Sequence, residues 1–156
     1  MMIGNIKKIN ITKSILNSTF EFLQEHGQRD LESHALWVGQ KTDTVFRVSD
    51  VWFPKQTNTP ISYEVPEEEE FRINKKLNDE SLTLMCQIHT HPSYAFHSNT
   101  DDEGSALVLP GSLSIVIPNY GFIQKDDFSR WEVYIFDGTH WCRLRREEVN
   151  ELFQII

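Results

Sequence analysis

Residues 82–91 constrain the possible fold more than any other segment of this chain. Apolar and polar side chains alternate along it, and a period of two is typical of a β-strand with one face turned to a core. His89 and His91 lie on the polar face, and Pro92 ends the strand. The chain therefore has to build a sheet that presents two imidazole rings where a strand exits. The opposite face is expected to bury Leu82, Leu84, Ile88 and, as a core thiol, Cys86.

Helices are predicted around this sheet. Apolar residues recur at helical spacing over residues 12–26, and Gly27 follows as a stop signal. Pro66 stands just ahead of four glutamates, which is how a second helix begins. A short helix is expected near residues 101–108, and the apolar residues of 149–156 predict a closing helix that reaches the last residue.

Five further segments are rich in β-branched or aromatic residues and are predicted to be strands. Residues 54–65 contain two prolines and are predicted to be a loop. Helices and strands in this order favour an α+β domain, or a three-layer α-β-α sandwich, with a mixed sheet. The five strands are expected at residues 35–39, 44–53, 114–117, 131–136 and 140–144.

Length and charge exclude several classes of protein. A chain of 156 residues suits one domain, so residues 1–156 are expected to form a single unit. Its 23 acidic and 15 basic residues give a net charge of −8, which argues against nucleic-acid or anionic-membrane partners and leaves room for a basic protein. The two cysteines, Cys86 and Cys142, are too few for a disulfide scaffold. Because we find neither a signal peptide nor an apolar run near the ~20 residues that span a bilayer, we expect a cytoplasmic protein.

Histidine and carboxylate residues suggest metal chemistry at the end of the histidine strand. His89 and His91 share one face about 6.5–7 Å apart along the chain, so their rings can converge on one ion, with Asp101 as a third ligand. Three protein ligands leave the fourth position of zinc open, which is the catalytic pattern. Each piece also has an ordinary explanation: a histidine pair can lie on a surface, and Ser98-x-x-Asp101 is close to a helix capping box. Glu32 would be unremarkable alone, and only the combination indicates a site.

That combination resembles the JAB/MPN metalloprotease family, whose members are also called JAMM proteases. The family pattern is an upstream Glu, then His-Ser/Thr-His-Pro, then Ser-x-x-Asp. Here Glu32 precedes a predicted strand that ends on Gly39, His89-Thr90-His91-Pro92 matches the second element, and Ser98-Asn99-Thr100-Asp101 matches the third. The resemblance covers most of the chain. It implies a JAB/MPN-like, cytidine-deaminase-like fold, in which helices flank a mixed, mostly antiparallel sheet.

The resemblance also implies a role for each site residue. His89, His91 and Asp101 would bind one zinc ion per chain. Glu32 would act as the general base, and Ser98 would donate a hydrogen bond to the oxyanion that forms during cleavage. The enzyme would then be a zinc metallopeptidase.

Within the family, the chain is similar to compact, stand-alone bacterial members. The activity implied is that of an isopeptidase or processing protease that cleaves after the C-terminal tail of a ubiquitin-like protein, for deconjugation or precursor maturation. Such members often accompany activating and conjugating enzymes, in some cases in antiphage operons. Two alternatives stay open: a JAB hydrolase that acts on a sulfur-carrier protein conjugate or on small peptides, and a catalytically silent MPN-type scaffold that binds partners.

Overall fold

The computed structural model describes residues 6–93 and 109–156. Its strands are β1 (Lys8–Ile11), β2 (His34–Thr42), β3 (Val45–Trp52), β4 (Thr57–Thr59), β5 (Ser62–Glu64), β6 (Thr83–Thr90), β7 (Leu113–Ile117), β8 (Glu132–Phe136), β9 (Trp141–Arg143) and β10 (Phe153–Ile155). Its helices are α1 (Lys13–Gly27), α2 (Glu67–Asp79) and α4 (Arg146–Leu152), with short 3₁₀ turns η1 (Asn119–Gly121) and η2 (Phe128–Arg130).

Eight of these strands form one mixed sheet, in the order β10-β1-β3-β2-β6-β7-β8-β9. β1 pairs in parallel with both β10 and β3, and β6 pairs in parallel with β7. The other four neighbouring pairs are antiparallel. β4 and β5 form a separate antiparallel hairpin. The predicted mixed, mostly antiparallel sheet is therefore confirmed.

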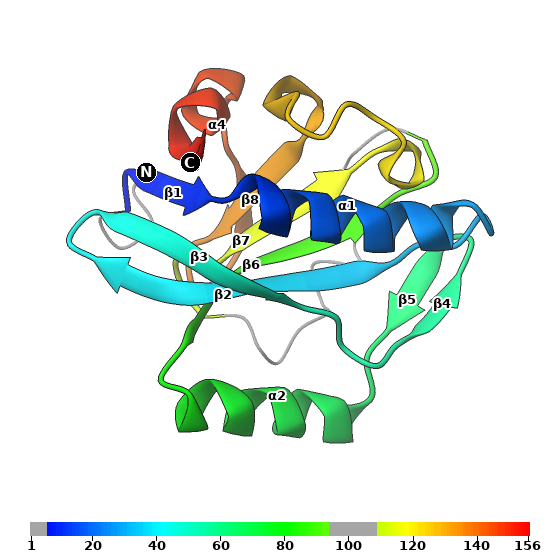
Figure 1. The fold of residues 1–156 in the computed structure, drawn as a ribbon, viewed down its shortest axis with the longest axis horizontal. Helices are drawn as coiled ribbons and strands as arrows, with labels where there is room; N and C mark the ends of the chain where they lie inside the picture. Colours follow the sequence, from blue (N-terminus) through cyan, green and yellow to red (C-terminus); the bar gives the residue numbers. More distant parts are fainter. Residues whose placement is uncertain (1–5, 94–108) are drawn as a thin grey trace.

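Helices cover both faces of the sheet (Figure 1). On one face, Phe20 and Leu23 of α1 pack with Trp37 of β2 in the larger core, which also contains the apolar side of α4. On the other face, Ile73 of α2 packs with Leu36 of β2 in a second, smaller core. Successive residues of a strand point to opposite faces, so β2 contributes to both cores. The layering is the predicted α-β-α sandwich.

Local sequence explains where the two long helices begin and end. The hydroxyl of Thr12 accepts a hydrogen bond from the Ile15 N–H at 3.2 Å and caps α1, within one residue of the predicted start. Gly27 ends α1, and a Cβ there would lie 2.6 Å from the carbonyl oxygen of Tyr120, so only glycine allows this close approach. Pro66 precedes α2, whose first turn carries four glutamates, as predicted.

One prediction for β6 is only half right. Cys86 and Ile88 lie in the larger core, opposite the face that carries the histidines, as expected. Leu82 and Leu84 instead pack against the smaller core under α2. The reason is a β-bulge: Trp37 lies opposite Cys86, and the next residue of β2 lies opposite Leu84, so Met85 is an extra residue that reverses the alternation.

Two other predictions are wrong. The predicted loop at residues 54–65 contains the β4–β5 hairpin, in which Thr57 lies opposite Glu64 and β-branched threonines flank the turn. The closing helix ends at Leu152 rather than at the last residue. Phe153 and the two residues after it leave the helix because they pair in parallel with β1, which sequence reasoning had also missed. The short helix predicted near residues 101–108 lies outside the described residues.

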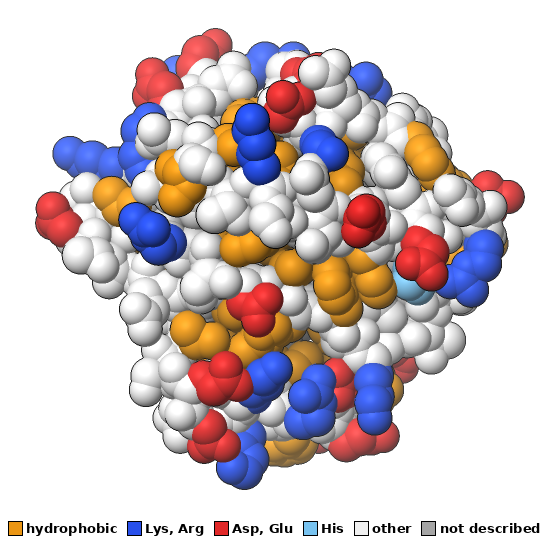
Figure 2. Space-filling view, in the orientation of Figure 1, with side chains coloured by type: hydrophobic (Ala, Val, Ile, Leu, Met, Phe, Trp, Pro, Cys, Tyr) orange, Lys and Arg blue, Asp and Glu red, His pale blue; other side chains and the backbone are white. Residues whose placement is uncertain are grey.

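Charge is mixed over the face of the molecule that Figure 2 shows. Acidic and basic side chains alternate around its rim and over α2, with hydrophobic side chains between α1 and α2. On this face, the net charge of −8 is therefore not gathered into one acidic patch. Among the helices of the described segments, none is long and apolar enough to cross a membrane.

Candidate functional site

The candidate site lies where β2 begins and β6 ends. These strands run antiparallel, and His34 lies directly opposite His89. Opposed residues of an antiparallel pair share a face, and alternation places His34 on the same face as Leu36, which packs under α2. The side chains of His34 and His89 therefore lie on the α2 side of the sheet. Continuing the register two residues places Glu32 level with His91.

The rings of His89 and His91 lie close together. Their centroids are 5.1 Å apart with planes inclined at 48°, and both residues are almost fully buried. Two imidazoles on one tetrahedral zinc ion, with Zn–N about 2.1 Å, would have centroids about 5.2 Å apart. The spacing of the rings therefore matches that of two imidazoles on one ion. The N–H of His91 donates to the Ile117 carbonyl, and its carbonyl accepts from the Tyr120 N–H, which fixes the strand exit.

The third ligand of the predicted set has no described position. Asp101 and Ser98 both lie outside the described residues. Within residues 6–93 and 109–156, no three His, Cys, Asp or Glu side chains are grouped so that they could hold a metal ion. The structure thus pairs the rings of His89 and His91 and sets the backbone of Glu32 level with His91, and the roles of all three residues remain predictions.

Hydrogen bonds hold the segment that carries Glu32. The residue is 4% exposed, and its N–H donates to the Thr59 carbonyl of the β4–β5 hairpin at 2.9 Å. Next to it, the Ser33 N–H donates to the hydroxyl of Thr90 at 3.0 Å, and the Ser33 carbonyl accepts from the Thr90 N–H at 3.1 Å. Thr90, which lies between the two histidines, therefore ties the glutamate segment directly to the histidine strand.

Two tyrosines that sequence reasoning missed complete the surroundings. The ring of Tyr63, from β5, stacks on His34 at 4.6 Å and lies 5.5 Å from the ring of His89. The hydroxyl of Tyr120 donates to the carbonyl of Pro60 at 2.8 Å and so ties the hairpin to the exit of the histidine strand. Burial, and then the nearby charges of Asp30 and Glu32, raises the pKa of Tyr120, so its phenol stays a donor at neutral pH.

A sequence signal for these contacts does exist. Thr57, Thr59 and Tyr63 are good strand residues placed on both sides of Pro60, which is a turn residue. That pattern could have predicted the hairpin, although not its contact with the histidines.

Fold and site together define a mixed α-β-α protein with two histidines and one glutamate at a single sheet end. No family model matches the chain. A relative from Sinorhizobium fredii named "Probable metalloprotease y4jG" is 33% identical over 142 residues, which are 88% of this chain and 87% of the relative. The chain belongs to the JAB/MPN metalloprotease family, as the sequence pattern predicted.

More distant relatives agree with this assignment. "AMSH-like ubiquitin thioesterase 3" of Arabidopsis thaliana is 26% identical over 119 residues, which are 73% of this chain and only 23% of that longer protein. The solution structure of protein DSY2949 from Desulfitobacterium hafniense superimposes with a TM-score of 0.65 at 13% identity, covering 95% of this chain and 92% of that one. The structural similarity supports the fold, and the names of both sequence relatives support a hydrolase.

Proposed function

We propose that this chain is a zinc-dependent hydrolase that cleaves the bond after the C-terminal tail of a ubiquitin-like protein. Two observations support the proposal: the strand register sets Glu32 level with His91 at a buried sheet end that carries the paired histidine rings, and relatives carry the names of a metalloprotease and a ubiquitin thioesterase. The first of these carries it, because a carboxylate beside two imidazoles is the arrangement that metal-assisted hydrolysis requires.

The roles follow from the chemistry of each group. His89, His91 and Asp101 would hold the zinc ion, which lowers the pKa of water and polarises a carbonyl when bound. Glu32 would take a proton from the attacking water and return it to the leaving amine. Ser98 would donate a hydrogen bond to the oxyanion. Because Glu32 and the histidines are buried, bulk water is largely excluded from the reacting groups.

We propose that residues 1–156 act as one domain in the cytoplasm, and that the substrate is made by associated activating and conjugating enzymes, as in antiphage operons. The substrate tail would enter as an extended segment, since only an unfolded tail can reach site residues that are as buried as Glu32, His89 and His91. The net charge of −8 argues against nucleic-acid or anionic-membrane partners.

Metal content and turnover test this proposal together. We expect about one zinc per purified chain by elemental analysis, lost from His91→Ala and Asp101→Ala and retained by His140→Ala, which removes an exposed histidine from the β8–β9 turn. Glu32→Gln should keep its zinc and lose about 10²–10⁴-fold in kcat on a panel of ubiquitin-like fusions.

Each alternative corresponds to a distinct result. Full activity of Glu32→Gln would refute the base assignment. Zinc without cleavage of any fusion, but with cleavage of sulfur-carrier conjugates or small peptides, would replace the substrate class. Absence of zinc from the wild type as well as from every variant, even after zinc is added, would favour the catalytically silent scaffold.

A further inference from the structure

Residues 32–34, the segment that carries Glu32, are hydrogen-bonded along their outer edge by side chains instead of by a neighbouring strand. The pairing of β2 with β3 ends at Leu36 opposite Trp52. Beyond that point the side-chain amide of Gln56 takes over: its Oε1 accepts from the His34 N–H at 2.9 Å, and its Nε2 donates to the His34 carbonyl at 2.9 Å. One amide group thus makes the pair of hydrogen bonds that a neighbouring strand would make.

The side chain of Asn58 bonds the backbone of Glu32 along the same edge. Its Nδ2 donates to the Glu32 carbonyl at 2.9 Å and to Oε1 of Gln56 at 2.8 Å. The Glu32 N–H donates to the carbonyl of Thr59, the residue that follows Asn58. Both backbone polar groups of Glu32 are therefore bonded to two consecutive residues of the hairpin. Thr90 bonds the intervening Ser33 from the other side, so every residue of the segment is held.

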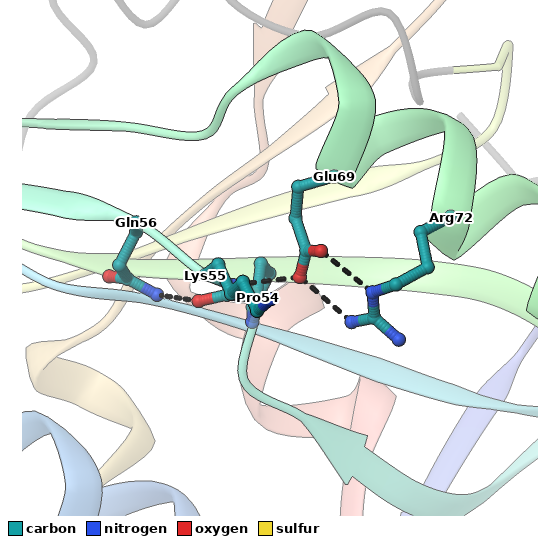
Figure 3. A network of polar contacts seen from close by, with 5 residues as sticks. All are labelled: Pro54, Lys55, Gln56, Glu69 and Arg72. Carbon is teal, nitrogen blue, oxygen red and sulfur yellow. Dashed lines mark hydrogen bonds and ion pairs between the residues drawn. The ribbon is translucent and has the colours of Figure 1, made fainter.

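The backbone just ahead of Gln56 is in turn anchored to α2, as Figure 3 shows. Nε2 of Gln56 also donates to the Pro54 carbonyl at 2.8 Å. The N–H of Lys55 donates to Oε2 of Glu69 at 2.8 Å, and Arg72 binds both carboxylate oxygens of Glu69 at 2.7 and 2.8 Å. These contacts fix the two residues ahead of Gln56 and hold its amide against the Pro54 carbonyl, so the amide has little freedom to turn.

We propose that Gln56 and Asn58 are positioning residues, which set the place of the Glu32 carboxylate by holding its backbone. The inference rests on the proposed function, because it gives Glu32 the role of proton carrier. A general base has to lie within about 2.6–3.2 Å of the proton that it takes, so a small shift of its backbone reduces turnover. Neither amide touches the reacting atoms.

Four variants and one control test the inference. Gln56→Glu and Asn58→Asp keep size and acceptors but remove every donated bond, whereas Gln56→Leu and Asn58→Leu remove the polar group without adding charge. Asn74→Asp adds the same charge on the exposed side of α2 and serves as the control. All five proteins are measured for zinc content, for kcat and KM on a cleaved fusion, and for hydrogen exchange of the backbone amides of residues 32–34.

We expect kcat to fall about 10–100-fold in the four variants, with KM changed less than about threefold and zinc retained. The amides of residues 32–34 should exchange at least about tenfold faster, while those of α1 stay protected as in the wild type and in Asn74→Asp. A rise confined to KM would assign the two residues to substrate binding and overturn the inference. Unchanged kcat in the leucine variants would also overturn it.

Hydrogen exchange keeps the two proposals separable. If the wild type cleaves no fusion, the proposed function fails, yet the exchange rates still decide whether the amides hold the segment. Exchange at residues 32–34 that stays at the wild-type rate in Gln56→Leu and Asn58→Leu would overturn the positioning role even in an active enzyme.

Discussion

The Glu69 carboxylate allows a quantitative prediction about stability and pH. The residue is 3% exposed and binds Arg72 through both oxygens, and it also accepts the Lys55 N–H. The hydrogen bond from Arg72 is the main cause that lowers its pKa from 4.5 to about 2, against the opposing effect of burial. Replacing Glu69 by Gln keeps the shape but removes the charge, and should therefore destabilise the fold.

The size of the effect follows from the pKa. A shift from 4.5 to about 2 corresponds to about 3 kcal/mol of stabilisation at neutral pH, at 1.36 kcal/mol per pH unit. Because the side chain of Arg72 is 53% exposed, solvent screening reduces this, and we expect about 2 kcal/mol. A lowered carboxyl pKa stabilises fully above 4.5, and the benefit is lost as the pH falls through about 2. At pH 3 the difference between wild type and Glu69→Gln should be less than half its value at pH 7.

Urea unfolding at pH 7 and pH 3, followed by tryptophan fluorescence, measures this difference. Glu68→Gln is the matched control, because Glu68 is an exposed residue of the same helical turn, and it should change the free energy of unfolding by less than about 0.5 kcal/mol. If Glu69→Gln is equally destabilised at both pH values, the lost stability comes from packing and the electrostatic reasoning is wrong.

Two further predictions concern the sheet and its thiols. Gly39→Ala should lower the free energy of unfolding by about 3 kcal/mol, since the new Cβ would lie 1.9 Å from the Arg47 carbonyl oxygen; a loss below about 1 kcal/mol in urea titrations would show that the bulge there relaxes freely. In the native protein at pH 8, a chromogenic disulfide reagent should modify Cys142, which is partly exposed, and leave Cys86 unmodified until urea is added, because complete burial raises the pKa of Cys86 and blocks access. Equal rates for the two thiols would contradict the assignment of Cys86 to the core.

Local patterns predicted the parts of this fold that local forces decide. Alternation in residues 82–91 predicted a buried strand with His89 and His91 at its exit, because the period of two is a property of the strand itself. Helical spacing and Gly27 predicted α1 to within one residue at each end. Neither pattern depends on what the segment packs against.

Features that depend on how distant segments pair were missed, because local patterns carry no information about the partner strand. Met85 is an extra residue only in the pairing of β6 with β2, and the residues around it in the sequence carry no signal for a bulge. The place of Glu32 beside His91 follows from the register of His34 opposite His89, which no local pattern encodes. Gln56 is an ordinary polar residue in the sequence, and its double hydrogen bond arises only because β3 stops pairing early.

The parallel pair of β1 and β10 joins segments that lie far apart along the chain. Ile9 lies opposite Phe153, the ammonium of Lys8 donates to the Glu151 carbonyl at 2.6 Å, and Figure 1 shows β1 beside the C-terminal end of the chain. Closing a longer loop costs more entropy, by about 0.6 kcal/mol for each doubling of its length. Residues 153–155 are also synthesised after every other strand of the described sheet. Until then β1 presents an unpaired edge, so this is the side on which a nascent chain is open to strand pairing with a neighbour.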